Sequence, residues 1–127
     1  MERIEIWLPW PPALNHMYRH YRNSVYLSEE AQKYKKKVDG LFGWQGECIW
    51  KAEMLTVRIT AFPPDCRTRD TDGILKCLLD AVPAGVGGIW ADDSQVAELY
   101  VLRVYDSRHR GSIRMEISEC GFDGVKK

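Results

Sequence analysis

An alternating, β-branched run, AEMLTVRITAF, occupies residues 52–62 and constrains the fold more than any other segment. Alternation over this length, with Val, Ile and Thr among its residues, is typical of a β-strand. Pro63 and Pro64 follow directly, and proline cannot donate the backbone hydrogen bond that a sheet needs. We therefore expect a central strand that ends at residue 62.

Three other segments have strand character. RIEIWLPW (3–10) alternates in part and then meets the first prolines, which predicts an opening strand ended by an extended turn. VAELYVLRVYD (96–106) and SIRMEISEC (112–120) are predicted to form an antiparallel hairpin across SRHRG. The polar and aromatic segment at 15–27 has no clean period, so we expect a loop there, with room for a short hairpin around YRNSVYL.

Two segments have helical periodicity. Ser28 is a good N-cap for EEAQKYKKKVDGLFG, which carries acidic residues in its first turn and ends at Gly43 or Gly46. Its apolar stripe is formed by Ala31, Tyr34, Val38 and Leu41.

The second helix is expected from about Thr71 to Ala81, before the breaker VPAGVGG. Its apolar side comprises Ile74, Leu75, Leu78, Leu79 and Val82, and its other side carries Asp72, Lys76 and Asp80. The resulting order, β-α-β-α-β-β, predicts an α+β protein with a small mixed sheet and two main helices packed on it.

Composition is that of an ordinary soluble protein. The 127 residues, 45% of them hydrophobic, are enough for one domain spanning residues 1–127 with a hydrophobic core. No apolar stretch approaches a membrane span, and MERIEIWLPWPP lacks the features of a signal peptide, so we expect a cytoplasmic protein without a membrane partner. The four cysteines are widely separated and contain no CxxC pair, which favours reduced thiols.

Charge argues mildly against a general nucleic-acid binder, because the net charge is 0. Its distribution is uneven, however. The segment from His16 to Lys37 contains Arg19, Arg22, Lys33, Lys35, Lys36 and Lys37 against two glutamates. Such a run can be a solvated face or a surface for DNA phosphates.

The segment RTRDTDGILK (67–76) crowds acids and bases together. Mg²⁺ prefers hard oxygen ligands and is usually held by one or two carboxylates, with waters and phosphates completing its shell. Asp70 and Asp72, at a helix start, can supply such ligands, and Asp92 or Asp93 in WADDSQ can add another. Lys76, one helical turn further, can reach a phosphate, as can Arg67 and Arg69.

A purely structural interpretation of the same residues stays open. Asp70 is a good N-cap, and Asp72 with Lys76 has the spacing of an ordinary surface ion pair. Asp92 and Asp93 can simply be turn residues. A zinc site at His16 and His20 is disfavoured, because Met17 stands where the zincin pattern requires glutamate.

Three segments together resemble the RusA family of Holliday-junction resolvases: LPWPPALNHMYRH (8–20), RDTDGILKCLLDAV (69–82) and WADDSQV (90–96). The match extends from about Ile4 to Glu119. The resemblance implies a small α+β homodimer, common in phages and prophages, that cuts four-way DNA junctions with paired, symmetric incisions during recombination and repair. Its cofactor would be Mg²⁺, with Mn²⁺ as a substitute.

The resemblance also implies roles for individual residues. Asp70, Asp72 and Asp93 match the essential metal-binding carboxylates, with Asp92 as a supporting neighbour, and Lys76 matches the catalytic lysine. The implied DNA contacts are Arg67, Arg69, Lys76, Asn15, Tyr18, Arg19 and His20.

Two departures from the family pattern are Gly73, where asparagine is usual, and the glycine-rich AGVGG (84–88). Two other functions stay open at this point. One is a non-catalytic DNA-binding module of the same fold, and the other is a nuclease that prefers flaps or forks.

Overall fold

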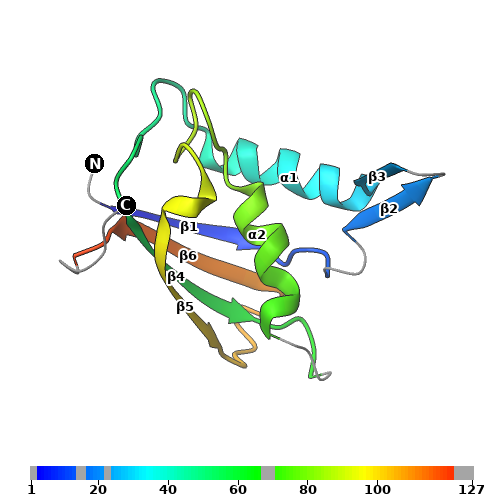
Figure 1. The fold of residues 1–127 in the computed structure, drawn as a ribbon. Helices are drawn as coiled ribbons and strands as arrows, with labels where there is room; N and C mark the ends of the chain where they lie inside the picture. Colours follow the sequence, from blue (N-terminus) through cyan, green and yellow to red (C-terminus); the bar gives the residue numbers. More distant parts are fainter. Residues whose placement is uncertain (1–2, 14–16, 22–23, 67–70, 122–127) are drawn as a thin grey trace.

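The computed structural model describes residues 3–13, 17–21, 24–66 and 71–121. The strands are β1 (Arg3–Pro9), β2 (Tyr18–Tyr21), β3 (Ser24–Leu27), β4 (Leu55–Phe62), β5 (Val96–Arg103) and β6 (Ser112–Glu119), and the helices are α1 (Glu29–Phe42) and α2 (Leu75–Ala81), with short 3₁₀ helices η2 (Thr71–Ile74) and η3 (Asp93–Gln95). Four strands form one sheet and β2 and β3 form a separate hairpin (Figure 1). The expected α+β class with two main helices is confirmed.

The main sheet has the order β1-β6-β4-β5, so β4 is central, as expected. β6 runs antiparallel to both β1 and β4, whereas β5 runs parallel to β4. Parallel neighbours need a crossover connection, and the segment containing α2 supplies it.

The predicted hairpin between residues 96–106 and 112–120 is therefore wrong: β5 and β6 are not neighbours. The side chains of Ile113, Met115 and Ile117 are fully buried in the core, as suits a strand that lies between two others under the helices. β5 carries half-exposed apolar side chains such as Tyr100 and Leu102, as suits an edge strand.

Helix α1 begins and ends as expected. The Ser28 side chain accepts a hydrogen bond from the Ala31 amide at 3.1 Å, and Gly43 ends the helix in the left-handed region at φ 56°. Tyr34 and Val38 are buried in the core, but Leu41 is 48% exposed, so its place in the apolar stripe is wrong. The helix ends one residue later, at Phe42, which is partly buried and packs against the core in its place.

Helix α2 is shorter than expected, because residues 71–74 form a 3₁₀ turn before it. Ile74, Leu78 and Val82 are buried as predicted. The core lies between the two helices and one face of the sheet. The other face of the sheet is polar, with ion pairs such as Arg3 with Glu116 at 2.8 Å.

A hydrogen-bonded carboxylate on that polar face leads to a prediction about acid stability. Glu98 accepts from the Thr56 and Tyr100 hydroxyls, each at 2.7 Å, and these bonds, with that from Cys120, lower its pKa from 4.5 to about 2. Because the folded pKa is depressed, the stabilisation is fully present above pH 4.5 and is lost as the pH falls towards 2. We expect Glu98→Gln to reduce the free energy of unfolding at pH 7 and to have a smaller effect at pH 2.5, as measured by urea unfolding. The exposed Glu119→Gln is the control, and equal effects of Glu98→Gln at both pH values would contradict the prediction.

Candidate active site

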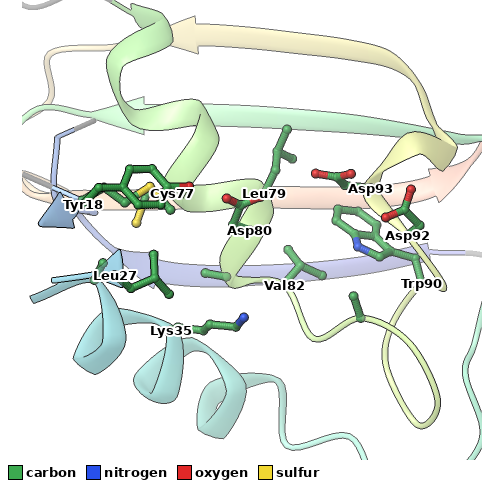
Figure 2. A pocket seen from close by; sticks show the side chains of 14 residues that line it. Tyr18, Leu27, Lys35, Cys77, Leu79, Asp80, Val82, Trp90, Asp92 and Asp93 are labelled. Carbon is green, nitrogen blue, oxygen red and sulfur yellow. The ribbon is translucent and has the colours of Figure 1, made fainter. Parts of the chain in front are cut away.

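A cavity of about 390 Å³ lies between α1, α2 and the segment that precedes β5. Three carboxylates line it, those of Asp80, Asp92 and Asp93. Tyr18, from the start of β2, and Lys35, from α1, complete its polar lining, and Figure 2 shows these side chains around one space. The structure thus places Asp80 of α2 and Asp93 of η3 on the same cavity, although they are 13 residues apart in sequence.

Asp92 and Asp93 have different local roles. The Asp92 carboxylate caps η3 by accepting from the Ser94 amide at 3.1 Å, so this residue has a structural role in the turn. Asp93 is the first residue of η3 and is exposed, with its carboxylate at the cavity (Figure 2). Asp93 is therefore the acid of this pair that suits ligand binding.

The turn that carries these acids is attached to a distant loop. The Trp50 amide donates to the Ile89 carbonyl at 3.1 Å, and the Ala91 amide donates to the Trp50 carbonyl at 3.2 Å. Both Trp50 and Trp90 are almost completely buried. Two tryptophans and a short backbone ladder thus place residue 91, the start of the turn, at the edge of the core.

Lys76 forms its ion pair with Asp80, at 3.2 Å, and not with Asp72, as the structural interpretation proposed. The hydrogen bond to Asp80 raises the pKa of Lys76, and the neighbouring Tyr18 adds to this shift. Lys76 is therefore held as a cation beside the cavity, which suits stabilisation of negative charge and not proton abstraction.

Asp72 lies in η2, one helical turn before Lys76, and its side chain is exposed. It is not among the described residues that line the cavity. The predicted site residues Asp70, Arg67, Arg69 and Asn15 lie outside the described residues. His20 is exposed on β2, and for Arg19 only the backbone is described.

Within the described ranges, no three His, Cys, Asp or Glu side chains are close enough to share a metal ion. The ligand set of Asp70, Asp72 and Asp93 depends on a residue outside those ranges, so it stays a prediction. Its chemistry fits a hard cation, because Asp72 and Asp93 are exposed carboxylates that can be approached from solvent.

Two charged residues of the cavity, Asp80 and Lys35, were not predicted as site residues. Asp80 follows Lys76 by four positions. This spacing placed the two residues on the same side of the helix, but it gave no reason to assign Asp80 a role in the site. Lys35 belongs to a basic run whose members were indistinguishable by sequence. It follows the buried Ala31 by four positions, so it lies on the side of α1 that meets the cavity.

The family model for endodeoxyribonuclease RusA matches residues 9–117 of this chain. The chain belongs to the RusA family. Curated relatives named crossover junction endodeoxyribonuclease RusA come from Enterobacteria phage 82, Shigella sonnei and Escherichia coli K12. Each is 34% identical over 121 residues, which cover 95% of this chain and 98% of the relative. The RusA-family match therefore includes both segments that carry the described carboxylates.

No described helix of this RusA-family protein is long and apolar enough to cross a membrane.

Proposed function

We propose that this RusA-family chain is a metal-dependent endodeoxyribonuclease that resolves four-way DNA junctions. The observation that carries the proposal is the family match over 9–117, within which Asp93, Lys76 and Asp80 lie around or beside one cavity. The relatives from Enterobacteria phage 82 and Escherichia coli K12 are named crossover junction endodeoxyribonucleases, which also supports this proposal. The proposed role is in recombination and repair.

The proposed cofactor is Mg²⁺, for which Mn²⁺ can substitute, held by Asp70, Asp72 and Asp93. When bound, the metal supplies activation of water and neutralisation of charge on a phosphodiester. Lys76 contributes a fixed positive charge near the scissile phosphate, and Asp80 orients its ammonium group. Tyr18, adjacent to Lys76, lines the same cavity and is proposed to contact the phosphate.

The proposed DNA contacts include both basic and uncharged polar residues. Those proposed are Arg67, Arg69, Lys76, Asn15, Tyr18, Arg19 and His20. Lys35 is added because it lines the same cavity as Asp93. A cation at this position can pair with a phosphate next to the one that is cut, and so fix the register of the strand.

Two copies of the chain are proposed to act together. A four-way junction has approximate two-fold symmetry, and its resolution needs a cut in each of two strands. A homodimer with an isologous interface presents one site to each of these strands.

The experiment that tests this function uses a strand-labelled four-way junction, with Mg²⁺ or with EDTA, beside the variant Asp72→Asn. Symmetric incisions that require both the metal and Asp72 are expected. We expect Asp72→Asn to bind the junction at least as well as the wild type, because removing a negative charge eases the approach of phosphate. Normal cutting by Asp72→Asn would overturn the metal-site assignment. Junction binding without incision in Mg²⁺ or Mn²⁺ would indicate a non-catalytic DNA-binding module. Incision of flaps or forks, but not of four-way junctions, would indicate a nuclease with a different branched substrate.

A further prediction concerns the Lys76–Asp80 pair. In Asp80→Asn, Lys76 keeps its charge at neutral pH, since its ordinary pKa is 10.5, but it loses its fixed orientation. We expect cleavage at pH 8 to slow by about tenfold, with unchanged or tighter junction binding. Single-turnover rates and binding in EDTA measure the two effects. The exposed Asp39→Asn on α1 is the matched control, and an unchanged single-turnover rate in Asp80→Asn would remove Asp80 from the site.

A further inference from the structure

We infer that Gln95 is a positioning residue of the proposed active site, whose buried amide holds the Asp92–Asp93 turn in place. Only 1% of Gln95 is exposed. Its Oε1 accepts from the amides of Ala91, at 2.8 Å, and Asp92, at 3.0 Å. Its Nε2 donates to the carbonyls of Trp50, at 3.0 Å, and Glu53, at 2.9 Å.

These four partners determine the orientation of the amide group. Backbone amides can only donate and backbone carbonyls can only accept, so the oxygen must face residues 91 and 92 and the nitrogen must face residues 50 and 53. The side chain uses two acceptor sites and both donors at once. Neither an ionised carboxylate nor an apolar side chain can replace this set, because a carboxylate cannot donate to the carbonyls of Trp50 and Glu53 and an apolar side chain makes none of the four bonds.

Besides Gln95, the turn is held by backbone bonds such as that from the Ala91 amide to the Trp50 carbonyl and by the Asp92 cap, and not by side-chain packing of its middle residues. Residues 91–94 are all exposed, between the buried Trp90 and Gln95. Packing therefore fixes the two ends of the turn, and the Gln95 amide joins its first residues to the loop before β4. The two amides that it accepts from belong to the residues immediately before Asp93, so its loss changes where the Asp93 carboxylate lies.

The expected effect of Gln95 on metal binding and cleavage rests on the proposed function, because a displaced Asp93 matters only if Asp93 binds a metal. Groups that orient a metal ligand typically change metal affinity by about 10–100-fold when removed. A residue needed only for folding would lower stability and leave metal affinity unchanged in the folded protein.

The test compares Gln95→Glu, which preserves shape and the acceptor oxygen, with the wild type. In the folded variant the bonds to the Trp50 and Glu53 carbonyls are lost, and we expect Mn²⁺ binding about tenfold weaker or more by calorimetry. We expect cleavage to need correspondingly more metal, with junction binding in EDTA within twofold of wild type. Gln95→Met, which removes all four bonds, should also speed hydrogen exchange at the amides of Ala91 and Asp92.

Two controls separate positioning from stability. Ile117→Val lowers stability from within the core, far along the chain from the turn, and should leave Mn²⁺ affinity and exchange at 91 and 92 unchanged. Ser94→Ala changes the turn but keeps the amide that Asp92 caps. Wild-type Mn²⁺ affinity in folded Gln95→Glu, or wild-type exchange at residues 91 and 92 in folded Gln95→Met, would overturn the inference. A wild-type protein that cuts no branched DNA would overturn the proposed function, while the exchange data still decide whether Gln95 holds the turn.

Discussion

Replacing Asp93 by asparagine is expected to reduce junction cleavage by about a hundredfold or more while the protein stays folded and still binds the junction. Asparagine has nearly the same shape as aspartate but lacks its charge, and a neutral amide is a poor ligand for Mg²⁺. Asp93 is exposed and does not cap η3, so the substitution removes no contact that the fold requires. Single-turnover cleavage and binding in EDTA measure the two parts of this expectation.

The neighbouring variant Asp92→Asn is a matched control. It removes the same charge one residue away, but asparagine is as good an N-cap as aspartate, so the capping bond to the Ser94 amide is kept. We expect Asp92→Asn to retain most of its cleavage activity, consistent with a supporting role. Equal losses in the two variants would mean that the net charge of the turn, and not one ligand, determines the rate.

Gly88→Ala is expected to have the largest effect on stability. A Cβ at this position would lie 2.7 Å from the Ala84 backbone and from the Pro83 carbonyl oxygen. Backbone atoms cannot move aside as a flexible side chain can, so the loop must open. Opening the loop breaks two backbone hydrogen bonds that support the turn before β5. In these bonds the Ile49 amide donates to the Gly88 carbonyl and the Trp50 amide donates to the Ile89 carbonyl.

We expect Gly88→Ala to lower the free energy of unfolding by about 3 kcal/mol or more, with a fall in Tm of about 10 °C. Calorimetry and urea unfolding measure this effect, and cleavage should fall with it even where the protein is folded. Gly40→Ala in α1 is the control, because nothing lies within 4 Å of the added methyl group there. That variant should gain about 0.5–1 kcal/mol from helix propensity. A neutral Gly88→Ala would mean that the loop is not rigid.

Much of the secondary structure is determined by local pattern. The N-cap at Ser28 and the left-handed Gly43 bound α1 because their geometry involves only nearby backbone groups. Alternation in 52–62 identified the central strand, and periodicity at 74–82 identified the buried side of α2. In the same way, local sequence and family resemblance were enough to single out Asp72, Lys76 and Asp93 as candidates.

The tertiary structure alone decided the order of the strands. β6 pairs with β4 and β1, although β5 precedes it in the chain. The choice of neighbouring strands depends on how the whole sheet buries its apolar face, and not on which strands are consecutive in sequence. The partner of Lys76 was also undetermined by spacing. Asp72 and Asp80 both lie four residues from it, and the packed helix selects Asp80.

The setting of the candidate site is likewise a tertiary property. The partners of Gln95 are as far away as Trp50, 45 positions earlier, so no local pattern could show that this glutamine supports the turn. The sequence by itself determined which residues carry charge and which local elements present them. Only folding decided that Asp80 meets Asp92 and Asp93 in one cavity, because that meeting requires a parallel crossover between β4 and β5 to bring α2 and η3 together.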